Sequence, residues 1–384
     1  TGASVPVDGG GAMRVRFPGW RNRSAGPDFR DAVIESDGET LRGDVEVHRD
    51  ARDWVRHGHD VDPRYANVVL HVVGDAPDNP PGPARRVRAS TLGSLAPKSE
   101  RGVFACRPKG ALHLGSVQSL LLSVGMARYR VAADRLSARL DGIWGDADRS
   151  SAAEQIVFEE VAAALGFAGN EGAMLRCVQA LPLATIRAMP TSSSGEFDPA
   201  REAILSVAFD GGARLPTSRD PLGSHAGRHL IQWVLAGVRP SNHPLRRLSQ
   251  VVTIARAWPN DGMIAAVRDG LRATANVPQR AGPRLRALVA PNAAAGSRAG
   301  DVVVNVLLPL ARAMAVRSGD AEMLAWADAA VAAHSKLSEN AVTARVASRL
   351  GVAPRLVALN AAAQQGLISI WDGPCRPLRC DLCP

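Results

Sequence analysis

Two carboxylates and an imidazole occupy alternate positions in the segment Gly43-Asp-Val-Glu-Val-His48. Side chains alternate between the two faces of a β-strand, so Asp44, Glu46 and His48 are expected on one face and the valines on the other. Burying such groups is costly unless their charge is neutralised, which a divalent cation does directly. Asp28, at the start of the expected partner strand, can converge on the same place. The pattern therefore predicts a metal site held by Asp28 and Glu46, with Asp44 in reserve.

A second group of potential ligands follows in His57, His59 and Asp62. The spacing His-x-His, with an Asp three residues later, suits zinc or another transition metal as well as it suits catalysis. His71 lies further on, in an apolar run, and could join this group. The alternative is structural: Asp62 would be a turn or cap residue, and His71 a hydrogen-bonded histidine of the core.

Three of the five cysteines lie within the last ten residues, namely Cys375, Cys380 and Cys383. Short spacings of this kind favour metal ligation, and Cys106 is the best candidate for a fourth ligand. Four thiolates could hold zinc or a 4Fe–4S cluster. Cys177 falls inside an expected helix and is interpreted as a small buried residue. The alternative for the terminal cysteines is a loose tail of reduced thiols.

The charge balance favours a nucleic-acid partner. There are 46 Lys and Arg against 37 Asp and Glu, for a formal net charge of +9, and nearly all the basic residues are arginines. Basic side chains neutralise phosphates, although a bias toward arginine codons also contributes to such a composition. The segment Arg239–Arg247 begins an expected helix and is a candidate phosphate seat. Its candidate contacts are Arg239, His243, Arg246 and Arg247; the alternative is that these arginines form ion pairs with acidic residues.

These residues must be positioned by two kinds of structure. Residues 13–17 alternate, the segments 31–35 and 41–48 form a hairpin about a turn at 36–39, and the apolar run 68–73 predicts a strand buried on both faces. Residues 60–67 are expected as a short helix or loop. From about residue 115 the apolar spacing becomes helical. The helices expected there are 116–140, 152–165, 172–180, 199–207, 227–235, 244–257, 300–316, 321–335, 339–350 and 353–365.

The predicted fold class is α+β, with three parts along the chain. Residues 1–110 form an endonuclease-like mixed β-sheet module, residues 111–372 a mostly α-helical domain, and residues 373–384 a cysteine-containing tail. No run of eighteen apolar residues occurs, so a membrane span is not expected and the chain is predicted to be cytoplasmic. The sequence has neither a phosphate-binding loop ending in Gly-Lys-Ser/Thr nor a Gly-x-Ser-x-Gly elbow. P-loop nucleotide hydrolysis and serine-hydrolase chemistry are therefore unsupported.

Pro27-Asp28, a hairpin, and Glu46-Val-His48 together resemble the motif of the PD-(D/E)xK phosphodiesterase superfamily, which includes restriction endonucleases and junction resolvases. The resemblance implies that Asp28 and Glu46 bind Mg²⁺ or Mn²⁺. In that superfamily a Lys two residues after the Glu positions the attacking water. His48 stands there in this chain, and imidazole can orient or deprotonate water but supplies no fixed positive charge at neutral pH. His48 could equally be a third metal ligand.

A longer resemblance is to the bacterial domain of unknown function 2851 family. It is carried by Gly26-Pro-Asp-Phe29, Gly43–His48, Asp53-Trp54, His57-Gly-His59, Asp62, Tyr65, Asn67–His71, Arg239–Pro244, Asn305, Pro309 and the terminal cysteines. This family carries no assigned activity. The function expected from the motifs is metal-dependent phosphodiester hydrolysis on DNA or RNA. The alternatives are a catalytically inactive nucleic-acid-binding module and a zinc-dependent hydrolase of another substrate.

Overall fold

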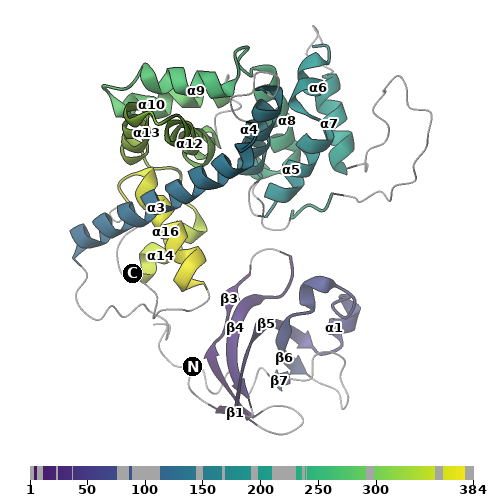
Figure 1. The fold of residues 1–384 in the computed structure, drawn as a ribbon. Helices are drawn as coiled ribbons and strands as arrows, with labels where there is room; N and C mark the ends of the chain where they lie inside the picture. Colours follow the sequence, from purple (N-terminus) through teal and green to yellow (C-terminus); the bar gives the residue numbers. More distant parts are fainter. Residues whose placement is uncertain are drawn as a thin grey trace. The chain divides into compact units, whose positions relative to one another are not determined.

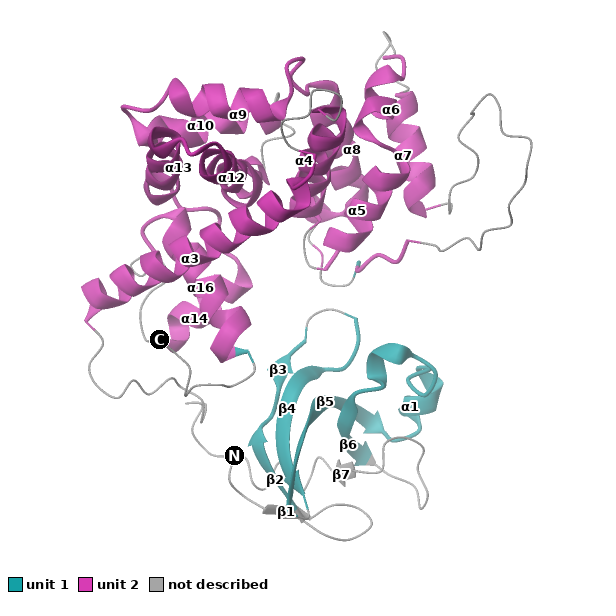
Figure 2. Ribbon diagram, in the orientation of Figure 1, with its two compact units in different colours: residues 1–109, 235–237, 376–379 teal, residues 110–234, 238–375, 380–384 magenta. Residues whose placement is uncertain are grey.

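The chain divides into two compact units (Figure 2). The computed structural model describes residues 4–6, 12–22, 25–36, 38–75, 86–88, 113–143, 150–166, 169–191, 198–209, 231–235, 238, 240–290, 298–350 and 358–376. Unit 1 comprises residues 1–109, 235–237 and 376–379, and unit 2 the remainder. Unit 1 is built on a curved mixed β-sheet and unit 2 on helices (Figure 1), which confirms the α+β class.

Unit 1 contains one sheet of seven strands in the order β1-β2-β4-β5-β6-β7, with β3 also paired to β4. The predicted hairpin is present as the antiparallel pair β4 and β5, and the predicted buried strand is β6, which runs parallel to β5. The bounds are β1 Ser4–Pro6, β2 Ala12–Phe17, β3 Trp20–Arg21, β4 Phe29–Ser36, β5 Glu39–Asp50, β6 Val68–Asp75 and β7 Arg86–Arg88.

The sheet separates an apolar face from a polar one. Its apolar cluster consists of Met13, Ala32, Ile34, Val45, Leu70 and Val72, all buried. Glu46 and His71 are paired neighbours on β5 and β6, and each directly follows a member of this cluster. Because side chains alternate along a strand, Glu46 and His71 lie on the opposite face. The connection from β5 to β6 holds the short helices α1 (Asp53–Arg56) and η1 (Pro63–Tyr65).

Unit 2 is helical throughout its described secondary structure, apart from an isolated bridge between Ser335 and Asn360. Its long helix α3 packs against α12 and α16. The bounds are α3 Leu114–Leu140, α4 Ser150–Leu165, α5 Glu171–Ala180, α6 Leu183–Ala188, α7 Pro199–Phe209, η3 Pro240–Asn242, α8 Pro244–Arg256, α9 Met263–Arg272, η4 Pro278–Arg280, α10 Ala281–Val289, α11 Ala299–Val302, η6 Val303–Leu307, α12 Leu308–Ser318, α13 Ala321–Ala333, α14 Ala341–Arg349, α16 Ala361–Ile370 and η7 Trp371–Cys375.

Two helix predictions need correction. The helix expected over 227–235 is absent from its described part: residues 231–235 are not helical, the Trp233 indole donates to Ala208 O, and Val234 N donates to the Asn170 side chain. These side-chain and backbone partners replace a helical ladder. The helix expected over 353–365 begins only at Ala361 in the described residues, because the Asn360 side chain caps it by accepting from Ala363 N.

One helical stretch, Ala299–Ser318, is long and apolar enough to cross a membrane by length and composition alone. Its mean hydropathy is 1.6, but 72% of the apolar window is buried inside the unit, as in the core helix of a globular protein. It contains a π-helical turn at Val303–Leu307. Pro309 follows that turn and has no N–H to offer the carbonyl four residues earlier, which accounts for the local departure from α-helical bonding.

Candidate metal centre

Glu46, His48 and His59 converge on the polar side of the sheet in unit 1. Glu46 and His48 are two residues apart on β5, and His59 comes from the connection that follows this strand. All three side chains are buried. The alternation of β5 therefore positions the first two residues, and the path of the β5–β6 connection brings in the third.

The two carboxylate oxygens of Glu46 have different surroundings. Oε2 accepts a hydrogen bond of 2.9 Å from the backbone N–H of Asp28. Oε1 lies 3.4 Å from His48 Nε2 and 3.7 Å from His59 Nδ1. Both separations exceed the usual N–H···O range of up to about 3.2 Å. Among the described residues neither imidazole nitrogen has a hydrogen-bond partner, although both are buried.

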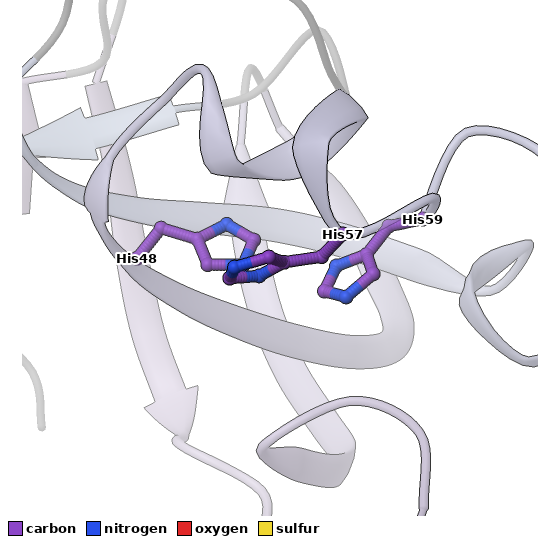
Figure 3. A group of neighbouring side chains, drawn as sticks. All are labelled: His48, His57 and His59. Atoms are coloured by element: carbon purple, nitrogen blue, oxygen red, sulfur yellow. The ribbon is translucent and has the colours of Figure 1, made fainter.

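These distances suit three ligands of one small cation. Bonds of about 2.0–2.1 Å arranged tetrahedrally place neighbouring ligand atoms about 3.3–3.4 Å apart. His57 lies close by: His48, His57 and His59 each have a ligand nitrogen within 4.8 Å of the others (Figure 3). His57 is exposed, whereas the other two histidines are buried. The site thus has an open side at His57.

The chemistry of the donors indicates which cation would fit. Imidazole suits zinc, copper, iron and nickel, whereas carboxylate, carbonyl and water ligands suit Mg²⁺, Ca²⁺ and Mn²⁺. One carboxylate oxygen with two or three imidazole nitrogens is a donor set of the first kind. In the described part of the chain, His48 Nε2 and His59 Nδ1 are buried without a hydrogen-bond partner and face Glu46 Oε1. The donors present therefore fit a metal ion.

A second histidine pair supports this arrangement. His48 Nδ1 and His71 Nε2 are 2.8 Å apart, and His71 on β6 is completely buried. Histidines that bind metals almost always donate their other ring N–H to a neighbouring group. If His48 donates from Nδ1 to His71, its Nε2 lone pair faces Glu46, as a metal ligand requires.

Burial sets the protonation of the cluster. It raises the pKa of the Glu46 carboxyl to about 7, although the Asp28 N–H acts in the opposite direction. Burial, followed by the neighbouring histidines, lowers the pKa of His48, and burial and then His57 lower the pKa of His59. Both imidazoles are therefore neutral at neutral pH, which is the form that binds metals.

The turn before β4 shapes the carboxylate side of the centre. Gly26 has a φ of +104°, and an added Cβ there would lie 2.7 Å from the Arg30 guanidinium. This turn delivers Asp28, whose Oδ2 accepts from Val47 N at 3.1 Å while its own N–H binds Glu46. Asp28, which was predicted as a ligand, therefore lies beside Glu46 and clamps β5. Its side chain is exposed.

The Asp44 side chain stabilises a β-bulge in the neighbouring strand β4. The β4–β5 register shifts between Phe29 and Ala32, and Asp31 has a left-handed φ of 58°. Asp44 Oδ1 accepts from Asp31 N at 3.0 Å, which satisfies an N–H that the bulge removes from the ladder. Burial raises the pKa of the Asp44 carboxyl. Asp44, which was predicted as a reserve metal ligand, thus accepts a hydrogen bond from the backbone of Asp31.

Aromatic residues hold the β5–β6 connection against the centre. The His59 ring stacks on Tyr65 with centroids 3.7 Å apart and planes 13° from parallel. The Trp54 ring meets His59 at 5.5 Å and His71 at 5.2 Å. Neither aromatic residue was predicted to take part in the site. Their role could have been suspected from the sequence, because both stand among the histidines in a segment that has neither strand nor long-helix periodicity.

Asp62 takes the structural role that was the alternative to ligation. Its side chain caps η1 by accepting from Arg64 N, and both carboxylate oxygens also contact the Arg64 guanidinium. The Arg64 contacts lower the pKa of this carboxyl. Asp62 is therefore engaged by Arg64, and His59 is the member of the predicted His57–Asp62 group that faces Glu46.

The two other predicted sites are only partly described. Cys375 is buried at the end of η7, while Cys106, Cys380 and Cys383 lie outside the described residues. Their ligation of zinc or a 4Fe–4S cluster remains a prediction. Burial raises the pKa of the Cys177 thiol to about 12, in keeping with an inert core position.

At the start of α8, one residue of the predicted phosphate-binding site, Arg247, is not available at the surface. Arg247 is buried and donates 2.6 Å hydrogen bonds to Asn242 and Gln250, and burial lowers its pKa to about 10. It is therefore not placed to meet a nucleic acid at the surface. His243 caps α8 by accepting from Leu245 N, Arg246 is exposed, and Arg239 lies outside the described residues.

Comparison with known protein families finds a match over the N-terminal part of the chain. Residues 5–86 match the family model described as "Protein of unknown function (DUF2851)", which confirms the predicted resemblance over these residues. The matched segment contains the whole centre, from Asp28 to His71. No curated protein and no solved structure matches the chain. The resemblance to the PD-(D/E)xK superfamily rests on the motif alone.

Proposed function

We propose that unit 1 is a metal-dependent phosphodiesterase that hydrolyses DNA or RNA, with the metal held by Glu46, His48 and His59. One observation carries the proposal: two buried imidazole nitrogens, which have no hydrogen-bond partner in the described part of the chain, face a single carboxylate oxygen at 3.4 and 3.7 Å. A bound divalent cation activates water and offsets charge that develops on a phosphate. The imidazoles favour Zn²⁺ over Mg²⁺, and the Glu46 carboxylate is compatible with Mn²⁺.

The surrounding residues have distinct roles in this proposal. Asp28 fixes Glu46 through its N–H and fixes β5 through its carboxylate, so that Oε1 of Glu46 stays directed at the histidines. His71 orients His48. His57, the exposed member, is the first of the three histidines that a substrate meets, and can hold or move a proton there. His48 thus acts as a ligand rather than as a replacement for Lys.

The choice of a nucleic acid rests on two features. Asp28 lies beside Glu46, and the order Pro27-Asp28, hairpin, Glu46-Val-His48 resembles the superfamily motif. The net charge of +9 favours a polyanionic partner, because basic side chains release counterions from phosphates. Arg246 and His243 remain proposed contacts, whereas buried Arg247 is left out.

A zinc-dependent hydrolase of another substrate is the second candidate. It is favoured by the histidine-rich donor set, which resembles the ligands of catalytic zinc more than the oxygen shell of Mg²⁺-dependent nucleases. The inactive binding module is the third, since no Lys stands at position 48.

The proposal is tested by incubating the full chain with single- and double-stranded DNA and RNA and with Zn²⁺, Mn²⁺ or Mg²⁺. Wild type should cleave with Mn²⁺ or Zn²⁺, and Glu46→Ala should abolish cleavage. Glu39→Ala is the matched control, because Glu39 is an exposed glutamate on the same strand. Asp28→Ala should lose cleavage but keep salt-dependent binding.

Three other outcomes would overturn the proposal. Binding without cleavage would favour the inactive module. Metal binding without any effect on nucleic acid would favour the hydrolase of another substrate. Equal cleavage by wild type and Glu46→Ala would show that the activity does not belong to this centre.

A further inference from the structure

A pocket of about 530 Å³ opens beside the candidate metal centre, within the β5–β6 connection of unit 1. Its lining includes Trp54, Val55, His59, Val61 and Tyr65. His59 thus belongs both to this pocket and to the histidine cluster. A group bound in the pocket would lie directly next to a group held at the metal.

The pocket offers apolar and aromatic surface to solvent. Val61 is 79% exposed and Val55 is 49% exposed, and the Tyr65 ring stacks on His59. Two exposed valines at the mouth of one concavity are unlike the scattered apolar residues of an ordinary surface. Sites of this size with apolar walls and a few polar groups are typical of small-molecule and side-group recognition.

The charged groups of the pocket argue against a phosphate inside it. Its charged lining residues, Asp60 and Asp62, are both acidic, and Asp62 is paired with Arg64. Asp60 is exposed. A carboxylate repels a phosphate but accepts hydrogen bonds from amino groups. The combination fits a flat heteroaromatic ring with amino donors, which is the chemistry of a nucleobase.

We infer that this pocket binds a nucleobase next to the phosphate that is held at the metal centre. The inference rests on the proposed function and narrows its substrate. A base can enter the pocket only when it is out of the helical stack, so the substrate is single-stranded, looped or frayed nucleic acid rather than an intact duplex. The base contacts the Val61 and Tyr65 side, while its phosphate faces His59.

Binding and cleavage are measured on the full Mn²⁺-loaded chain with four oligonucleotides: a single strand, the same strand as a duplex, the strand with one abasic position, and the strand abasic throughout. Base stacking on a protein contributes a factor of about 5 to 150 per base. We expect the single strand to bind at least five times more tightly than the duplex or the fully abasic strand.

Val61→Asp places a charge at the mouth of the pocket, on a side chain exposed enough that the fold should not change. It should remove the preference for the single strand over the fully abasic strand while Mn²⁺ affinity stays unchanged. Val316→Asp is the matched control, since Val316 is 56% exposed in unit 2. It should behave as wild type.

The outcomes separate the two proposals. Cleavage that ignores the missing bases, prefers the duplex, or is unchanged in Val61→Asp would overturn the nucleobase pocket and leave the metal-dependent phosphodiesterase standing. A wild-type chain that binds Mn²⁺ but neither binds nor cleaves any oligonucleotide would overturn both. Tight binding of the single strand without cleavage, lost in Val61→Asp, would support the pocket and overturn the activity.

Discussion

Glu46 in unit 1 and Glu160 in unit 2 are almost equally buried, with 6% and 8% of their surface exposed, but their neighbours differ. Glu160 accepts hydrogen bonds of 2.6 Å from Arg139 and 2.9 Å from Arg135. Among the residues that the structure describes, Oε1 of Glu46 meets no such cation and faces two neutral imidazoles at 3.4 and 3.7 Å. A buried carboxylate that is already paired with arginines belongs to the scaffold, whereas one that faces neutral imidazole nitrogens is neutralised either by a proton or by a metal cation.

The largest expected effect is on metal affinity. Replacing Glu46 by Gln removes the charge at the centre, so the affinity for Mn²⁺ and Zn²⁺ should fall at least about a hundredfold, beyond the effect of changes outside the ligand shell. Isothermal titration of the full chain measures it. Glu160→Gln should leave the affinity for both metals unchanged. If it weakened metal binding as much as Glu46→Gln does, the assignment of Glu46 as a ligand and Glu160 as a scaffold residue would be wrong.

The next effect concerns the orientation of His48. His71→Leu removes the partner of His48 Nδ1 and should weaken metal binding by about ten- to a hundredfold. His71→Gln retains a side-chain oxygen that can accept from Nδ1 and should recover part of the loss. Titration of both variants with Mn²⁺ distinguishes orientation from packing, because equal losses in both would indicate a packing role alone.

Acid should weaken metal binding. The pKa of the Glu46 carboxyl is raised to about 7, so below that pH the metal-free protein carries a proton that a cation must displace. Apparent affinity should decline by up to about tenfold per pH unit below 7 and level off above it. Titrations between about pH 6 and 8 measure this dependence. An affinity independent of pH over this range would mean that Glu46 is not a ligand.

The smallest effect is on stability in unit 2. Glu160→Gln leaves Arg139 and Arg135 without one charged partner, and since both guanidinium groups are partly exposed the loss should be about 1–2 kcal/mol. Denaturant unfolding measures it. Glu46→Gln should keep or slightly raise the stability of the metal-free protein, because it removes a poorly compensated buried acid.

The sequence predicted the parts of the centre that depend on strand periodicity. Glu46 and His48 share a face because they are two residues apart on β5, and the Asp-Gly turn predicted the hairpin that carries them. The bulge at Asp31 was not predictable, because no residue type marks it, and it is the bulge that engages Asp44.

The convergence of His59 with Glu46 depends on packing that no periodicity shows. His59 lies in an irregular connection whose path is fixed by contacts with Trp54 and Tyr65. The wrong helix prediction over residues 231–235 has a similar cause, since the apolar spacing suited a helix while Val234 N donates to the Asn170 side chain. The periodicity of the sequence thus predicted most strands and helices, whereas the paths of the connections depend on long-range contacts.

The most direct test of the central claim is the optical spectrum of the metal-free full chain titrated with Co²⁺. The histidine–carboxylate centre should give visible bands typical of nitrogen and oxygen ligands, which disappear in Glu46→Gln and persist in Glu39→Gln. The terminal cysteines, if they also bind, would add separate sulfur-to-cobalt bands. Visible bands that are identical in wild type and Glu46→Gln, or only sulfur bands, would contradict a metal centre at Glu46, His48 and His59.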